Sequence, residues 1–245
     1  MPLLYGTTDD GRVGSGTTTW AGARDVDTGT TINLTEAADS NFTAVHKFSG
    51  RGGGATFRVE RSFIYFDTSG VTGTVGSAQF ELVGSSGDDG SIIAVKSNAF
   101  GGDGGTALAK SDFDAMPGWA DGESQEGNVT AYSAAAAFES SGTWSTNSAN
   151  VLASTSDLLD DIKNNDVVIV CFINYTYDYL NVTIPSAGTV NLGARYTEAS
   201  SAGQRPRINY TLATGYGNDV NSVESANISK VNAVATANIE KVIGV

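Results

Sequence analysis

The feature that most constrains this chain is a set of short segments in which apolar and polar residues alternate. The clearest segment runs from Ala55 to Asp67, where Phe57 and Val59 alternate with Arg58 and Glu60. Successive side chains of a β-strand point to opposite faces of a sheet, so this alternation predicts a strand with one buried face. The end of the segment is apolar at consecutive positions, which predicts that the strand continues into a covered interior.

Similar segments predict a protein built from many strands. Alternation or β-branched residues mark six more stretches, at 30–35, 42–48, 77–83, 91–96, 189–196 and 207–212, with a polar loop at 84–90. The chain has 30 glycines and 4 prolines, a composition that supplies turns and interrupts few strands. We therefore expect an all-β fold over residues 1–215, an antiparallel β-sandwich resembling a jelly roll.

Two segments between these strands have their own signatures. The apolar run Val167–Ile173 predicts a buried central strand, and Cys171, the single cysteine of the chain, is expected there as a core residue. A short helix is predicted over 155–163, because Leu158, Leu159 and Ile162 share one side of it. Residues 100–150 show no clear period, and we expect loops there that pack Trp119 and Trp144 against the sheet.

The last thirty residues contain an eleven-residue repeat. Residues 220–230 align with 231–241, and a third copy begins at Val242. So short a unit cannot cover its own apolar side chains, so we expect residues 216–245 to form an anchoring or oligomerisation tail, with extended segments rather than a helix. An extension packed on its own sandwich is the alternative. The apolar positions expected to make assembly contacts are Val223, Ile228, Val231, Val234, Ile239 and Val242.

Charge and hydropathy exclude two classes of partner. The formal net charge is −13, which repels a phosphate backbone, so we expect no nucleic-acid binding. No apolar stretch is long enough to cross a bilayer, so we expect no membrane insertion. The first ten residues lack a basic segment followed by an apolar one, and we expect no classical export signal.

The residues that commonly carry chemistry are few, and the pattern favours a protein that is not an enzyme. His46 is the single histidine, and its place in a strand pattern predicts a surface position. No Gly-x-Ser-x-Gly or His-Glu-x-x-His motif is present, so we expect no catalytic residues, no cofactor and no metal-binding residues. The Asp- and Gly-rich loops 87–90 and 101–105 read as ordinary turns, with calcium binding as the alternative.

A tyrosine cluster is the one candidate for ligand contact. Tyr175, Tyr177 and Tyr179 surround Asp178 just after the predicted central strand. Their rings could stack on the rings of a glycan, whereas local packing is the alternative explanation.

Three stretches resemble the DNRLRE-type β-sandwich domain. They are Arg-Ser-Phe-Ile-Tyr-Phe-Asp-Thr-Ser-Gly-Val at 61–71, Ser-Ala-Gln-Phe-Glu-Leu at 77–82, and Tyr-Thr-Glu-Ala at 196–199 with Arg-Pro-Arg-Ile-Asn-Tyr at 205–210. Where that family often has an Arg-Glu pair near its end, this chain has Thr197-Glu198. The repeat sequences Asn-Ile-Ser-Lys-Val-Asn and Asn-Ile-Glu-Lys-Val also resemble repeats in structural proteins of marine tailed phages.

The resemblance implies a non-catalytic structural role. Such sandwich domains occur in bacterial surface proteins and in tailed-phage particles. The resemblance therefore implies that the chain is a virion structural protein of a tailed bacteriophage, namely a fibre, tail or capsid-decoration component, and that it is assembled in the host cytoplasm. The expected partners are other virion proteins and sister chains, in a homo-oligomer such as a trimer. The alternative is a carbohydrate-binding or adhesin module of a bacterial cell surface. In either role, a host-surface glycan is the ligand to consider.

Overall fold

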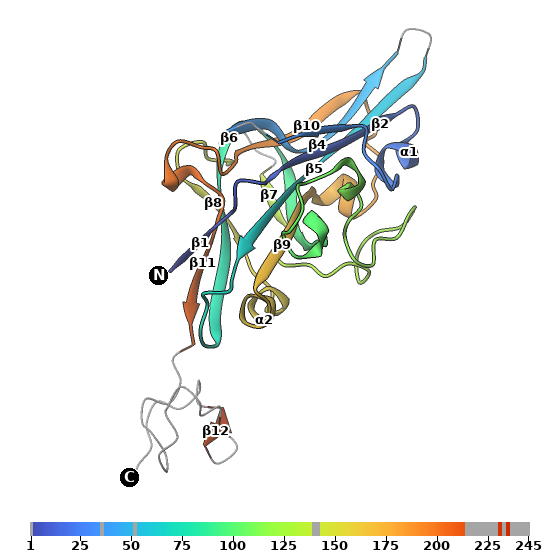
Figure 1. The fold of residues 1–245 in the computed structure, drawn as a ribbon. Helices are drawn as coiled ribbons and strands as arrows, with labels where there is room; N and C mark the ends of the chain where they lie inside the picture. Colours follow the sequence, from blue (N-terminus) through green and yellow to red (C-terminus); the bar gives the residue numbers. More distant parts are fainter. Residues whose placement is uncertain are drawn as a thin grey trace.

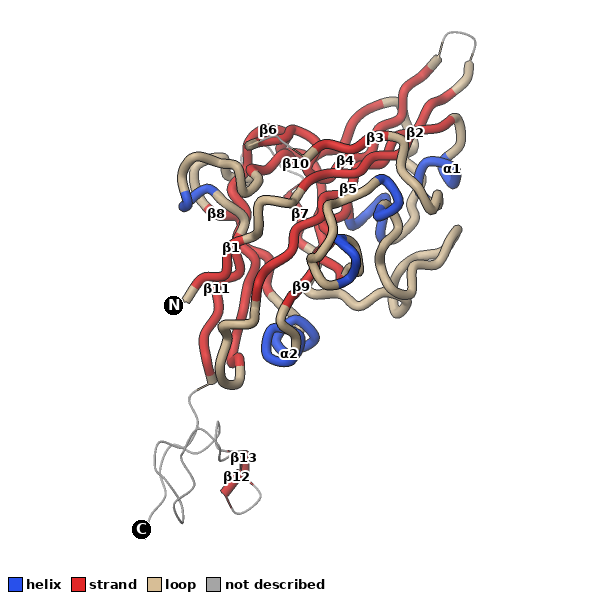
Figure 2. The backbone as a smooth tube through the Cα atoms, viewed as in Figure 1, coloured by secondary structure: helices blue, strands red, loops and turns tan. Residues whose placement is uncertain are grey.

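A computed structural model gives the fold of the chain and describes residues 2–34, 37–50, 53–138, 143–213, 230–231 and 234–235. Strands account for 45% of the described residues and helices for 14%, and the strand pairs are antiparallel (Figures 1 and 2). The predicted all-β, antiparallel class is therefore confirmed.

The strands and helices occur in the following ranges. The strands are β1 (Leu3–Tyr5), β2 (Gly11–Thr17), β3 (Thr31–Asn33), β4 (Ala38–Ser49), β5 (Ala55–Asp67), β6 (Val75–Lys96), β7 (Ala136–Phe138), β8 (Ala149–Ala153), β9 (Val167–Asn174), β10 (Gly188–Arg195), β11 (Arg207–Leu212), β12 (Lys230–Val231) and β13 (Val234–Ala235). The α-helices are α1 (Trp20–Arg24) and α2 (Ser156–Asn164), and Tyr175–Tyr179 forms one π-helical turn.

Strands β1 to β11 join into one sheet, in the order β1-β11-β6-β10-β4-β5-β2-β3 with β7, β8 and β9 off this path. The long strand β6 makes this possible, because its first part pairs with β11 and β8, its middle pairs with β10, and its last part pairs with β7 and β9. β5 and β6 are connected twice, through β4 and β10 at one end and through β9 at the other. A sandwich of two separate sheets is therefore not confirmed.

The middle of β6 corrects the sequence-based prediction. Residues 84–90 were expected to form a loop between two strands, but they continue the strand. Their backbone pairs with β10, where Asn191 lies opposite Asp89 and Ala194 opposite Gly84. Turn-forming residues were overridden here because neighbouring strands supply pairing partners at both ends of the stretch, β10 at Gly84, Asp88 and Asp89, and β7 at Gly90. Gly84 also permits close packing, since a Cβ there would lie 2.4 Å from the indole nitrogen of Trp144.

Both faces of β9 are buried, as its continuous apolar sequence predicted. Val168, Val170 and Phe172 point into one cluster of buried residues, which we call the inner core. The inner core contains residues of β4, β5, β6, β9 and β10 together with residues of α2, β8 and β11. The predicted helix is confirmed as α2, and its Leu158 and Ile162 are buried in the inner core.

The opposite face of β5 and β9 carries a second cluster, which we call the loop-covered core. Phe63 of β5 and Cys171 of β9 pack there against Phe100, Phe113 and Met116, which belong to the loops between β6 and β7. Figure 1 shows these loops, in green, beside β5 and β9. The two tryptophans pack as expected, because Trp144 is buried in the inner core and Trp119 lies partly buried against the loop-covered core.

The C-terminal segment is described at four residues. Strand β11 ends at Leu212, and the two-residue strands β12 and β13 pair with Val231 opposite Val234. The other four positions expected to make assembly contacts, Val223, Ile228, Ile239 and Val242, lie outside the described residues.

Candidate functional site

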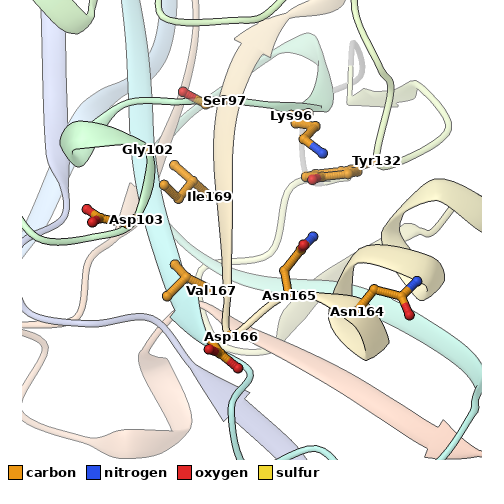
Figure 3. Close-up of a pocket in the computed structure, with 10 residues that line it drawn as sticks. All are labelled: Lys96, Ser97, Gly102, Asp103, Tyr132, Asn164, Asn165, Asp166, Val167 and Ile169. Carbon is orange, nitrogen blue, oxygen red and sulfur yellow. The ribbon is translucent and has the colours of Figure 1, made fainter.

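The candidate site is a cavity at the end of β6. Lys96, the last residue of β6, pairs with Val170, so the first three residues of β9 extend beyond this partner. The cavity beside them has a volume of about 560 Å³. Asp103, Asn164 and Asp166 are exposed at its rim, and Figure 3 shows Val167 and Ile169 on the same side of β9 as Asp103.

Three donors converge on Asp161 at one wall of the cavity. Lys96 Nζ donates to Asp161 Oδ2 at 2.7 Å, Asn165 Nδ2 donates to Oδ1 at 2.9 Å, and the Tyr132 hydroxyl donates to Oδ2. In Figure 3 the polar ends of these three donors lie close together. Sequence reasoning missed the cluster because its residues come from separate segments of the chain.

The electrostatics fix the protonation of this cluster. Burial disfavours the charged form of Asp161, but hydrogen bonds from Lys96 and Tyr132 outweigh it, and the pKa of Asp161 is lowered. Burial, together with the hydrogen bond to the Asp161 carboxylate, raises the pKa of Tyr132 far above its usual value. At neutral pH the carboxylate therefore stays ionised and the phenol neutral, so the cluster holds Lys96 in place rather than exchanging protons.

The predicted tyrosine cluster forms the π-helical turn after β9. Its start is held by the Asn174 side chain, which accepts a hydrogen bond from the Tyr177 N–H at 2.9 Å. The rings of Tyr175 and Tyr179 stack at 5.5 Å, and Tyr179 is buried against the loop-covered core. Tyr175 and Tyr177 are half-buried, so they are the members of the cluster with surface for a glycan, and that contact stays a prediction.

Beneath the tyrosine turn lies a buried cluster of opposite charges. Asp178 accepts two hydrogen bonds from Arg61, from Nε and Nη2, both at 2.8 Å. Arg24 Nε lies 3.7 Å from Asp178 Oδ1, and all three side chains are fully buried. The Arg61 guanidinium lies between the rings of Phe113 and Trp119, 4.1 and 4.0 Å from their centroids. We call Arg24, Arg61 and Asp178 the buried ion cluster.

The buried ion cluster ties irregular backbone to the sheet. Arg61 donates to the carbonyl oxygens of Phe113 and Arg24, and Arg24 donates to those of Asp178 and Glu123, at 2.7 or 2.8 Å. Burying a charge costs free energy unless it is paired and hydrogen-bonded, and these groups are both. The geometry therefore indicates a structural cluster that holds loops, because its charged atoms are already engaged.

A second buried carboxyl has no such cation. Asp10 accepts hydrogen bonds at 3.0 Å from the backbone N–H and the hydroxyl of Thr197, which fixes the N-terminal segment near the end of β10. Burial, followed by the negative charge of Glu198, raises the pKa of Asp10 to about 8. At neutral pH Asp10 is therefore mainly protonated. Its partner Thr197 follows Tyr196, a residue of the inner core.

One sheet face carries exposed apolar side chains. We call it the outer face, and it consists of the residues of β1, β6, β8 and β11 that point away from the inner core: Leu3, Tyr5, Gln79, Glu81, Val151, Arg207 and Asn209. Glu81 accepts hydrogen bonds from Gln79, Arg207 and Asn209 at 2.6 to 2.9 Å. Beside this polar group, Leu3, Tyr5 and Val151 are 39%, 38% and 46% exposed.

The remaining candidates from the sequence have structural positions. His46 lies in β4 as predicted, but the expected surface position is wrong, because its side chain is buried and stacks on Phe48. Burial lowers the pKa of His46 to about 4, so the ring is neutral at pH 7. Cys171 is buried, and burial raises the pKa of its thiol. Among the described side chains, no three of His, Cys, Asp and Glu lie close enough together to hold a metal ion.

No family model matches the chain, and no curated protein matches it. The similarity to the DNRLRE-type domain therefore stays a hypothesis that rests on three short stretches of sequence. Within the part of the chain that the structure describes, no helix has the length and apolar character needed to span a membrane.

Proposed function

We propose that this protein is a non-enzymatic structural component of a tailed-bacteriophage particle, a fibre, tail or capsid-decoration part. The observation that carries the proposal is the outer face, where Leu3, Tyr5 and Val151 are exposed on the layer that contains β11. β11 is the last strand of the main sheet, and the segment with the eleven-residue repeat follows it in the sequence. Exposed apolar surface, in a chain whose last thirty residues carry a repeat with apolar positions, suits a protein that assembles with other chains.

The buried charges support the same proposal. Arg24, Arg61 and Asp178 are engaged with one another and with loop carbonyls, and Asp161 is held by three donors. These groups stabilise a body that can present fixed surfaces to neighbouring subunits. Closed rotational symmetry is the usual arrangement for such parts, so we propose a homo-oligomer, with a trimer as the first arrangement to test.

Mass spectrometry of purified particles tests the role directly. The chain should be present at a fixed stoichiometry relative to the major particle proteins, and its absence from particles of a phage that encodes it would refute the proposal. Removal of residues 216–245 should leave residues 1–215 folded but monomeric by light scattering, and unable to join particles. Normal assembly of the truncated chain would show that the tail is not the anchor.

A carbohydrate-binding or adhesin module of a bacterial surface is the second candidate, because the cavity at the end of β6 has polar and apolar walls. Recovery of the chain from the outer surface of bacterial cells, rather than from particles, would favour this candidate. The two roles are therefore separated by where the full-length chain is found.

A further inference from the structure

The cavity at the end of β6 is lined by both hydrogen-bond donors and hydrogen-bond acceptors, which a site for hydroxyl groups needs. A sugar hydroxyl donates one hydrogen bond and accepts others, so a site for it needs both donors and acceptors. Lys96 and Asn164 supply donors at the cavity, and Asp103 and Asp166 supply carboxylate oxygens. Lys96 keeps two N–H groups beyond the one it gives to Asp161, and its side chain is 38% exposed.

The cavity also has an apolar wall and a suitable size. Val167 and Ile169 line it from β9, where they can cover the C–H face of a ring (Figure 3). Its volume of about 560 Å³ lies within the range of small-molecule sites, which is about 300–1,000 Å³.

Charge selects among ligands of that size. Asp103 and Asp166 at the rim disfavour an anionic ligand, and so does the net charge of −13. Lys96 pairs with Asp161 at 2.7 Å, which leaves that wall close to neutral. An uncharged ligand rich in hydroxyls can form hydrogen bonds with the polar walls without bringing a negative charge near Asp103 and Asp166.

We propose that this cavity binds a neutral polyhydroxylated ring, either a free hexose or the terminal residue of a glycan. The inference goes beyond the proposed particle role and does not depend on it, since either of the two candidate roles accommodates a sugar site. The site is also separate from the tyrosine turn, because neither Tyr175 nor Tyr177 lines the cavity.

A titration of the ¹⁵N-labelled full-length chain followed by NMR tests the proposal, with D-glucose, D-galactose and N-acetyl-D-glucosamine as probes. At least one of these sugars should cause saturable shifts at millimolar concentration, centred on the backbone amides of residues 164–167. Methyl glycosides form the second arm: equal binding assigns the terminal residue of a glycan, and lost binding assigns a free sugar.

Two variants locate the site. Asp166→Ala removes an exposed rim carboxylate and Lys96→Gln removes the charged donor, and each should weaken binding about fivefold or more because a hydrogen bond to a charged group is lost. The control is Asp121→Ala, which removes an exposed carboxylate outside the cavity and should leave binding unchanged. No shift with any sugar, unchanged affinity in both variants, or tighter binding of sialic acid than of the neutral sugars would overturn the proposal.

Discussion

The two cores of this protein are closed in different ways. The inner core is covered mainly by regular elements, with Leu152 of β8, Ile208 of β11 and Leu158 of α2 packed over β5 and β9. The loop-covered core is closed by irregular segments, and its cover is fixed by Arg24, Arg61 and Asp178. Strands and helices satisfy their own backbone groups, whereas buried loops need side chains to do so. That difference explains why Arg24 and Arg61 donate hydrogen bonds to loop carbonyl oxygens in the loop-covered core.

Asp178→Ala should have the largest effect, because it leaves two buried guanidinium groups without their shared carboxylate. We expect a loss of about 3–5 kcal/mol in the free energy of unfolding, measured by urea denaturation at pH 7. Hydrogen exchange should show the first loss of protection at residues 113–129, ahead of β8 and β11. Asp121→Ala is the matched exposed control. A loss below about 1 kcal/mol would mean that the loops do not depend on the buried ion cluster.

Leu152→Ala should weaken the inner core without the early loss of hydrogen-exchange protection at residues 113–129 that is expected for Asp178→Ala. The side chain is fully buried opposite Phe80, so its removal should cost about 2–4 kcal/mol in the same urea measurement. Because regular elements unfold together, protection should fall by a similar factor in β5, β6 and β9. Selective opening of β8 alone would show that the inner core is less cooperative than this comparison implies.

The raised pKa of Asp10 predicts that the free energy of unfolding depends on pH. Its folded pKa of about 8 lies above the usual value of 3.8, so between these limits the folded state holds a proton that the unfolded chain has lost. Its contribution to stability is therefore complete below pH 3.8 and declines as the pH rises towards 8. From pH 5 to pH 7 this amounts to about 2–3 kcal/mol.

Asp10→Asn keeps the shape of the protonated side chain and should remove this component from a series of urea denaturations between pH 5 and pH 8. The difference between the two proteins isolates Asp10 from all other titrating groups. An identical pH profile in the variant would mean that Asp10 is ionised in the folded protein.

Lys96→Gln should have the smallest effect on stability. The Lys96–Asp161 ion pair is partly exposed, and pairs of this kind contribute about 0–1 kcal/mol. Asp161 also keeps the hydrogen bonds from Tyr132 and Asn165. Urea denaturation should therefore give a change below about 1 kcal/mol, which makes this variant suitable for sugar titration. A larger loss would show that Asp161 and its three hydrogen-bond donors stabilise the fold, as the buried ion cluster does.

The strongest local patterns were predictable from sequence, and the functional geometry was not. Strands β5 and β9 and helix α2 have periods that dictate their faces, so their existence and burial followed directly. β1, β2 and β8 were missed because short or glycine-rich strands carry little period, and their pairing is decided by neighbours that are distant in sequence. His46 was placed on the surface because strand alternation cannot reveal that its ring stacks on Phe48.

By itself, the sequence determined an antiparallel β class, a buried central strand, one amphipathic helix and a terminal eleven-residue repeat. Only the tertiary structure decided that β6 runs unbroken through residues 84–90 and joins the strands in one sheet. It also brought Arg24, Arg61 and Asp178 together, and it opened a cavity where β6 stops short of β9. The physical reason is the distance along the chain over which residues interact. Periodicity depends on neighbours within one strand or helix, whereas ion clusters and cavities depend on contacts between segments far apart in the chain.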